Sequence, residues 1–293
     1  METHKFGFVT IVGKPNVGKS TLLNSIIGYK IAIATPKKNT TRNQIRGIYN
    51  DDNSQIVFID TPGFLETKNR LDEKMHKSIS ESLVGVEVIL YLLPFWKQLD
   101  NNYLQTINFF ANIHSKKYLV LTKIDKAKNK EEVMKYVSTL EHKELFDKII
   151  PTSALKTLNI KHLIEEIKLD LPKDALFYYD RDQIHENSDE FYISEIIREK
   201  LLLNFNEEIP YNVFVHVESI ENKKEVISIF AEIILDRESH KKIIIGKDGA
   251  KLKKIGIEAR KELENYFNKK IYLELFVKVR RDWKNKESIL NEI

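Results

Sequence analysis

The stretch Gly13-Lys14-Pro15-Asn16-Val17-Gly18-Lys19-Ser20 decides the fold of this chain. Two glycines, five positions apart and followed by lysine and serine, form the phosphate-binding P-loop pattern. Inward-facing backbone N–H groups and a helix that begins near Lys19 would attract an anion. Lys19 would reach the phosphates and the Ser20 hydroxyl would bind Mg²⁺. The predicted nucleotide-binding residues here are Gly13, Lys14, Pro15, Asn16, Val17, Gly18, Lys19, Ser20 and Thr21.

The flanking residues give this loop the context that a P-loop requires. The apolar run from Phe8 to Val12 predicts a buried strand over residues 5–12. After the loop, Leu22, Leu23 and Ile26 have helical spacing and predict a helix that reaches Ile27. The alternative, a chance glycine turn, fits this order of strand, loop and helix poorly.

The next 145 or so residues alternate between strand and helix patterns, as in parallel α/β domains. Further strands are expected at 46–50, 55–60, 86–93, 117–121 and 148–151. Helices are expected at 68–83, 103–113, 131–140 and 160–171, with Pro172 ending the last. The sequence therefore predicts an α/β P-loop domain over residues 1–172, with its ligands at the carboxyl ends of the strands.

A second phosphate and Mg²⁺ element is predicted at Asp60, Thr61, Pro62 and Gly63. An aspartate at the end of a buried strand suits a metal ion, and the following glycine can bring its N–H close to a phosphate. Taken alone, these residues could also form a surface turn.

Residues 5–171 resemble the translation-factor class of P-loop GTPases. Thr122-Lys123-Ile124-Asp125 corresponds to the guanine-reading motif of that class. The resemblance implies that Asp125 accepts two hydrogen bonds from guanine, which adenine cannot offer. It also implies that Lys123 lies across the base and that Ser153-Ala154 supplies an N–H to the guanine O6 atom. Thr122 stands where asparagine is usual, and the expectation is that its shorter side chain loses a bridge to the P-loop.

The same resemblance assigns residues near the phosphates. The threonine that closes over Mg²⁺ is expected to be Thr41 rather than Thr40, so the predicted metal ligands are Ser20, Thr41 and Asp60. Phe64 follows Gly63, where Ras-like enzymes place a water-orienting glutamine, which implies slow hydrolysis. Asn16 resembles the K⁺-binding asparagine of some GTPases, although it is also a common turn residue. Catalytic residues stay unassigned, with Asn16, Lys19 and Thr41 as the candidates.

A second domain is predicted over residues 188–293, after a charged linker at 173–187. Ser188 caps a helix to about residue 203, strands follow at 212–218 and 225–235 with a turn at 221–224, and a last strand covers 270–279. Between them, Gly246-Lys247-Asp248-Gly249 follows an apolar helix end, as in the RNA clamp of α+β type II KH domains. The predicted RNA-binding residues are Ile245, Gly246, Lys247, Asp248, Gly249, Lys251, Lys253 and Lys254.

Charge supports an anionic partner for this end of the chain. Residues 240–293 hold 15 basic and 8 acidic residues, whereas residues 175–239 hold 6 and 15. Charge alone would also fit an ordinary solvated surface. There is no cysteine, which excludes disulfides and thiol chemistry, and no apolar run of the roughly 20 residues that span a bilayer.

Together the two halves resemble the bacterial GTPases that carry a C-terminal KH domain. The resemblance implies a monomeric cytoplasmic GTPase that binds GTP or GDP, Mg²⁺ and the 3′ end of 16S rRNA, and that acts in small-subunit assembly. Peripheral membrane contact of the basic end and K⁺ binding are left open. Two alternatives also stay open: a P-loop ATPase or kinase with an RNA domain, and an RNA adaptor for which GTP is only a structural ligand.

Overall fold

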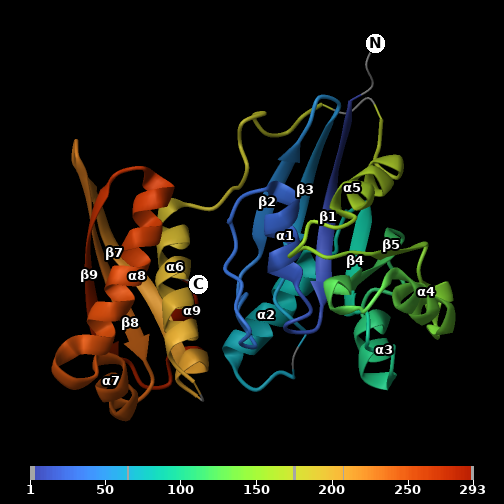
Figure 1. Ribbon diagram of the computed structural model, residues 1–293. Helices are drawn as coiled ribbons and strands as arrows, with labels where there is room; N and C mark the ends of the chain where they lie inside the picture. The colour runs from blue at the N-terminus through green and yellow to red at the C-terminus, as the bar shows by residue number, and fades with distance from the viewer. Residues whose placement is uncertain (1–3, 65, 174–175, 207, 292–293) are drawn as a thin grey trace. The chain divides into compact units, whose positions relative to one another are not determined.

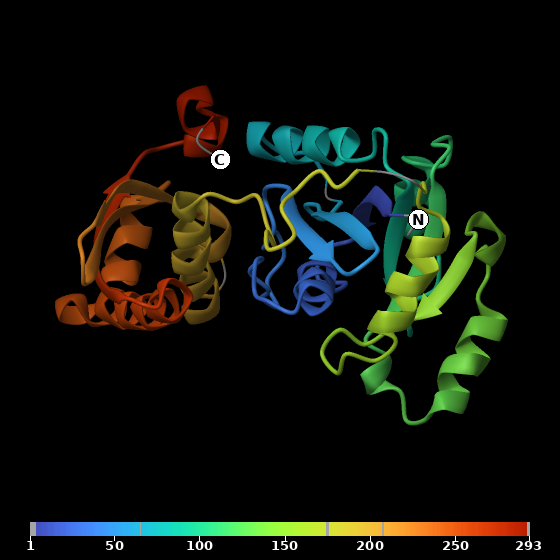
Figure 2. The ribbon, with the colours of Figure 1, turned by 90° about the horizontal axis from the view of Figure 1, so that it is seen from above.

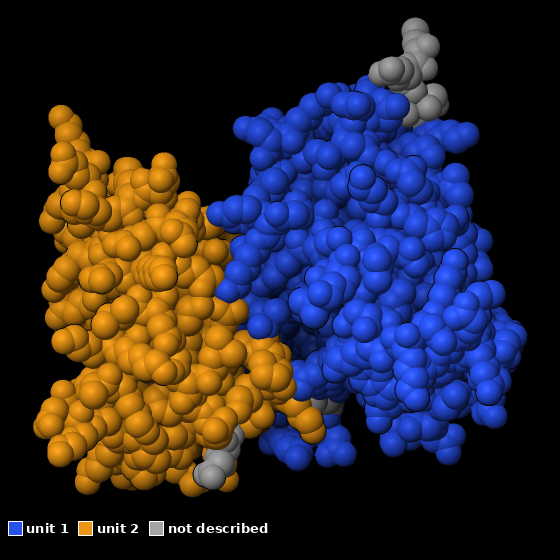
Figure 3. All heavy atoms as spheres, viewed as in Figure 1, with its two compact units in different colours: residues 1–34, 41–68, 72–186 blue, residues 35–40, 69–71, 187–293 orange. Residues whose placement is uncertain are grey.

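The computed structural model describes residues 4–64, 66–173, 176–206 and 208–291. The chain divides into two compact units, coloured separately in Figure 3. The first comprises residues 1–34, 41–68 and 72–186, and the second comprises residues 35–40, 69–71 and 187–293. The predicted boundaries at 172 and 187 stay a prediction, and residues 174–175 of the predicted linker lie outside the described residues.

The first unit contains a six-stranded sheet (Figure 1). Its strands and α-helices are β1 (Lys5–Gly13), α1 (Lys19–Ile27), β2 (Ile45–Asn50), β3 (Ser54–Asp60), α2 (Arg70–Glu81), β4 (Val88–Pro94), α3 (Asn101–Asn108), β5 (Lys116–Thr122), α4 (Lys130–Thr139), β6 (Lys148–Pro151) and α5 (Ile160–Leu169). The strand order is β2-β3-β1-β4-β5-β6, and only the β2–β3 pair is antiparallel. The predicted α/β fold is confirmed.

The parallel register aligns the carboxyl ends of the central strands. Ile11 of β1 pairs with Asp60 of β3, and Pro94 of β4 pairs with Thr122 of β5. Strand β4 is buried along its whole length, as its continuous apolar run predicts for a strand covered on both faces. Helices α1 and α2 lie on opposite faces of the sheet (Figure 2). The motifs at residues 13–20, 60–63 and 122–125 therefore meet at the carboxyl ends of the strands.

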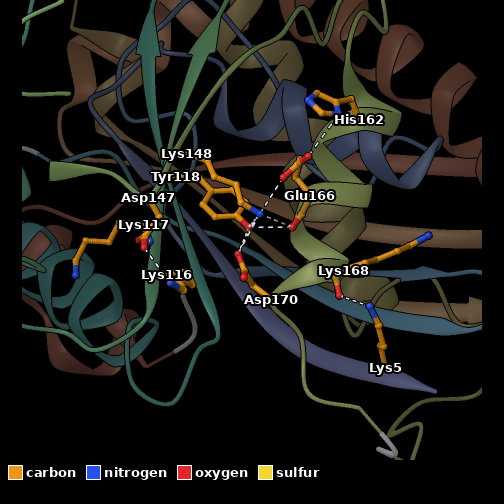
Figure 4. Close-up of polar contacts among 10 residues, drawn as sticks. All are labelled: Lys5, Lys116, Lys117, Tyr118, Asp147, Lys148, His162, Glu166, Lys168 and Asp170. Atoms are coloured by element: carbon orange, nitrogen blue, oxygen red, sulfur yellow. Dashed lines mark hydrogen bonds and ion pairs between the residues drawn. The ribbon is translucent and has the colours of Figure 1, made fainter. Parts of the chain in front are cut away.

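Polar contacts join the amino ends of β5 and β6 to helix α5 (Figure 4). The Lys148 ammonium lies 2.9 Å from a Glu166 carboxylate oxygen and 3.2 Å from an Asp170 oxygen. The Tyr118 hydroxyl donates to Asp170 and receives a hydrogen bond from Lys148 at 2.9 Å. These polar groups pair with one another at the amino ends of the strands, away from the motifs at the carboxyl ends. We therefore assign them a structural role.

Helix α3 ends earlier than the pattern predicted, at Asn108 rather than at residue 113. Beyond it, Phe110 and Ile113 donate to carbonyls three residues back, which is the bonding of turns rather than of an α-helix. The spacing of the apolar residues could not distinguish a turn from a longer helix, because Phe110 is fully buried in this turn as it would be in a helix.

Residues 176–186, which belong to the first unit, pack against its sheet. The buried Gln55 side chain accepts hydrogen bonds from the Tyr178 and Tyr179 N–H groups and donates to the Tyr179 carbonyl. The Ile48 N–H of β2 donates to the Ile184 carbonyl at 2.9 Å. This segment therefore covers the edge of the sheet at β2 instead of leaving that edge unpaired.

The second unit contains a three-stranded sheet in the order β7-β8-β9. Its strands and α-helices are α6 (Asp189–Asn204), β7 (Val213–Asn222), β8 (Val226–Leu235), α7 (Glu238–Ile245), α8 (Ala250–Phe267), β9 (Lys270–Val279) and α9 (Glu287–Leu290). Strand β8 is antiparallel to β7 and parallel to β9. Helices α6 and α8 cover one face of this sheet (Figures 1 and 2). The predicted α+β KH fold is confirmed.

Two details of this unit differ from the sequence prediction. Glu221 and Asn222 belong to β7 rather than to the turn, because they pair with Ser228 and Ile227 of β8 beyond a register shift. Helix α9 was not predicted, and neither was the burial of Trp283, whose ring stacks on Phe214. Only the folded sheet creates the apolar surface that this tryptophan covers.

Within the part of the chain that the structure describes, we find no helix whose length and hydropathy would let it span a bilayer.

Candidate nucleotide site and nucleic-acid interface

The P-loop has the backbone conformation that a phosphate cradle needs. Gly13, Asn16 and Gly18 have φ angles of +153°, +63° and +108°, a region that glycine and, less often, asparagine adopt more readily than other residues. Gly63 of the second motif approaches the loop so closely that a Cβ atom there would lie 2.8 Å from the Pro15 nitrogen. The two phosphate motifs, about 45 residues apart in sequence, therefore form one surface at the ends of β1 and β3.

Lys19 is buried and held by the loop itself. Its ammonium donates to the Gly13 carbonyl at 3.1 Å and to the Lys14 carbonyl at 3.2 Å. Burial lowers the pKa of Lys19 to about 8, although the nearby Asp60 carboxylate opposes this shift. Lys19 is the first residue of α1, and the N-terminus of a helix favours anions. Its ammonium, held here by two carbonyl oxygens, is therefore suited to bind a phosphate.

Ser20, Thr41 and Asp60 meet as the predicted metal ligands should. The Ser20 hydroxyl donates to Asp60 Oδ2 at 2.6 Å, and the Thr41 hydroxyl lies 2.9 Å from the Ser20 hydroxyl and 3.5 Å from Asp60 Oδ2. Thr40 instead bonds to Thr35 and to the Lys37 carbonyl. Only Thr41 therefore belongs to this cluster.

The Asp60 carboxylate has spare capacity that fits a cation. It is fully buried, and among the described residues its Oδ1 atom has no hydrogen-bond partner. Burial raises the pKa of Asp60 to about 6, although the charge of Lys19 and the hydrogen bonds that Asp60 accepts oppose this shift. Such a carboxylate, beside two hydroxyls, offers the hard oxygen ligands that Mg²⁺ prefers. The residues present thus fit the metal ion that the motif implies.

Binding of Mg²⁺·GDP to the nucleotide-free protein is expected to release protons at about pH 5.5 and to take them up at about pH 8.5. At the lower pH most Asp60 carboxyls carry a proton that metal binding displaces, because their pKa is about 6. At the higher pH most Lys19 amines are neutral, since their pKa is about 8, and a phosphate next to them raises it. Calorimetry in buffers of different ionisation enthalpy measures both. A release at low pH that is unchanged without Mg²⁺ would contradict the role of Asp60.

The predicted base-binding residues lie together at the ends of β5 and β6. The Ser153 hydroxyl donates to Asp125 Oδ1 and so orients the carboxylate. The Ser153 N–H donates to the Leu158 carbonyl at 3.1 Å. Because this N–H is already engaged, the neighbouring N–H of Ala154 is the candidate donor for a guanine oxygen.

Thr122 keeps the bridge to the P-loop that it was expected to lose, so that expectation is wrong. Its hydroxyl donates to the Val17 carbonyl at 2.8 Å, and the side chain is buried. The Lys123 ammonium adds a hydrogen bond of 2.6 Å to the Asn16 carbonyl. The strand end and the loop approach closely enough for a threonine to span the distance, which a sequence pattern does not reveal.

Two aromatic residues border the site. The Phe64 ring packs edge-on against Phe109, with 5.5 Å between centroids, and its N–H donates to the Gly13 carbonyl. Trp96, at the end of β4, lies beside the ammonium groups of Lys123 and Lys126, 5.9 and 5.3 Å from its ring centroid. Trp96 belongs to no sequence motif, although its position just after a buried strand is a usable signal.

The predicted RNA clamp joins α7 to α8 in the second unit. Gly246 and Gly249 have φ angles of +72° and +75°, and Asp248 between them has +51°. Ile245 is half-buried, and Lys247, Lys251, Lys253 and Lys254 are exposed. A Cβ atom on Gly246 would lie 2.8 Å from the Lys251 side chain, whereas one on Gly249 would meet nothing within 4 Å. The loop thus presents open backbone flanked by lysines.

Comparisons with known proteins match a family to each of the two parts of the chain. Residues 8–124 match the family described as 50S ribosome-binding GTPase, and residues 208–284 match the KH domain. A crystal structure of Era in complex with MgGDPNP and nucleotides 1506–1542 of 16S ribosomal RNA is 36% identical, covers 98% of each chain and has a TM-score of 0.94. Aquifex aeolicus Era, as a single-site variant bound to GDP·AlF4⁻, is 36% identical over 98% of each chain, with a TM-score of 0.92.

The fold and the site therefore define a P-loop GTPase joined to a KH domain. With 36% identity over 98% of both chains, the protein belongs to the Era family.

Proposed function

We propose that this protein binds GTP and GDP with Mg²⁺, hydrolyses GTP, and binds the 3′ region of 16S rRNA in assembly of the small ribosomal subunit. The observation that carries the proposal is the joint presence, on one Era-family chain, of an oriented Asp125 carboxylate, a Ser20–Thr41–Asp60 cluster and a lysine-flanked Gly246–Gly249 loop. The Era complex with MgGDPNP and 16S rRNA nucleotides supports the ligand assignment.

In this proposal each residue has a defined task. Lys19 and the P-loop N–H groups hold the phosphates, while Ser20, Thr41 and Asp60 hold Mg²⁺, which would offset phosphate charge. Asp125 and the Ala154 N–H select guanine, and Lys123 covers the base. The remaining contact residues, assigned from the motifs alone, are Thr21, Thr61, Pro62, Gly63, Phe64, Thr122 and Ile124. RNA backbone lies against Ile245, Gly246, Lys247, Asp248, Gly249, Lys251, Lys253 and Lys254.

The test combines RNA binding with turnover. Fluorescence anisotropy with an oligonucleotide of the rRNA 3′ end should show different affinities in the presence of a GTP analogue and of GDP. Phosphate release should exceed one per protein and be competed by GDP but not by ADP. Competition by ADP would favour the ATPase alternative, and RNA binding without turnover would favour the adaptor.

Hydrolysis is expected to be slow, and faster in K⁺ than in Na⁺. Phe64 cannot orient water, because its ring carries no hydrogen-bonding group and packs on Phe109. A K⁺ ion held by Asn16 would add positive charge near the phosphates. Phosphate release at matched ionic strength in the two salts measures the ratio.

The matched variant is Asn16→Gly, because glycine adopts the +63° φ angle of this position without strain. The ratio of rates in K⁺ and Na⁺ should fall to about one in this variant if the Asn16 side chain binds the ion. Equal rates in both salts for the unaltered protein would exclude a role for K⁺.

A further inference from the structure

The Lys14 side chain, at the first variable position of the P-loop, leaves the loop and reaches helix α3. Its ammonium lies 4.0 Å from the centroid of the Tyr103 ring. This is well within the distance at which an ammonium is attracted to an aromatic face. The side chain of Lys14 therefore extends from the P-loop to α3 in this structure.

The ring that receives Lys14 is rigidly held. Tyr103 is 8% exposed and belongs to the apolar cluster between the sheet and helices α2 and α3. Asp100 caps α3 by accepting the Tyr103 N–H at 3.1 Å, and the Tyr91 hydroxyl donates to the Tyr103 carbonyl at 3.3 Å. Partial burial lowers the pKa of Lys14; the charge of Asp100 opposes this shift and the charge of Lys97 adds to it.

Lys14 also contacts the residue that would hold the phosphates. Its backbone carbonyl accepts a hydrogen bond from the Lys19 ammonium at 3.2 Å. Tyr103 therefore contacts Lys14, and Lys14 in turn contacts Lys19. A displacement of Lys14 would move an acceptor of Lys19 and the turn that precedes the phosphate-facing N–H groups.

We propose that Tyr103 is a positioning residue which, through the Lys14 cation, holds the P-loop in its phosphate-binding conformation. The inference rests on the proposed GTP and GDP site. It assigns to Tyr103, in the first turn of α3, an effect on the dissociation rate of the bound nucleotide.

The test is a double-mutant cycle on the dissociation rate of a fluorescent GDP analogue. Lys14→Met keeps the length of the side chain and removes its charge, and Tyr103→Leu removes the aromatic face. Each is expected to speed dissociation about fivefold, the range of a partly buried cation–π contact. The double variant should be no faster than either single one, since both remove the same contact.

Conservative variants separate positioning from a general loss of structure. Tyr103→Phe retains the ring and should stay within about twofold of the unaltered protein, and Lys14→Arg, which retains a cation, should dissociate more slowly than Lys14→Met. Melting temperatures show whether a variant is folded, and if Tyr103→Leu is not, the comparison of Lys14→Met with Lys14→Arg decides alone. Multiplying effects in the double variant, or unaltered dissociation from Lys14→Met, would overturn the inference. Failure of the unaltered protein to bind GDP would instead overturn the proposed function.

Discussion

Replacing Asp125 with asparagine is expected to weaken GTP binding by about 2 kcal/mol or more, which is about 30-fold. The carboxylate would accept hydrogen bonds from two guanine donors, and an asparagine amide turned toward them would present donors to donors. The Ser153 hydroxyl would still find an acceptor in the asparagine side chain, since it donates to a single oxygen, Asp125 Oδ1. The loss should therefore concern recognition of the base rather than folding.

The same variant should gain affinity for xanthosine triphosphate, whose 2-oxo group accepts where guanine donates. Competition binding with GTP, xanthosine triphosphate and ATP measures the exchange of preference. Asp147→Asn serves as the control, because this carboxylate bonds to Lys116 and the Lys117 N–H, outside the base-binding residues. Unchanged GTP affinity in Asp125→Asn would remove this residue from the site.

Replacing Gly249 with aspartate is expected to lower RNA affinity about tenfold or more, because a carboxylate would meet phosphate where the backbone must lie close. A side chain has room there, since a Cβ atom on Gly249 meets nothing within 4 Å. Its φ of +75° is strained for other residues but tolerated best by asparagine and aspartate. The substitution thus adds charge at the clamp at modest cost to the fold.

Gly249→Asn is the matched control, because asparagine has the same size as aspartate and the same backbone preference but no charge.

Lys247→Glu should also weaken RNA binding and flatten its salt dependence, since each neutralised phosphate contributes about −0.7 to the log–log slope for single strands. Anisotropy with the rRNA 3′-end oligonucleotide at several salt concentrations measures both, and circular dichroism checks the fold. Equal affinity and slope for the aspartate and asparagine variants would contradict the placement of RNA backbone at this loop. GTP affinity should be the same in all three.

The sequence by itself determined the features that reside in contiguous residues. The P-loop from Gly13 to Ser20, the strand ending at Asp60 and the loop from Gly246 to Gly249 each combine a local turn with its flanking elements. Their conformations follow from glycine at positive φ and from apolar runs, which are properties of neighbours in the chain. The fold class and most candidate site residues could therefore be predicted.

Tertiary structure decided whatever depends on distance between strands and helices. It placed the Thr122 hydroxyl on the Val17 carbonyl, so the expected lost bridge was wrong, and it engaged the Ser153 N–H. It also buried Asp60 beside Lys19, which shifts the pKa of both, and it set Lys14 on Tyr103. These contacts join residues up to about a hundred positions apart, and packing of the sheet and helices, rather than any local pattern, sets their separations.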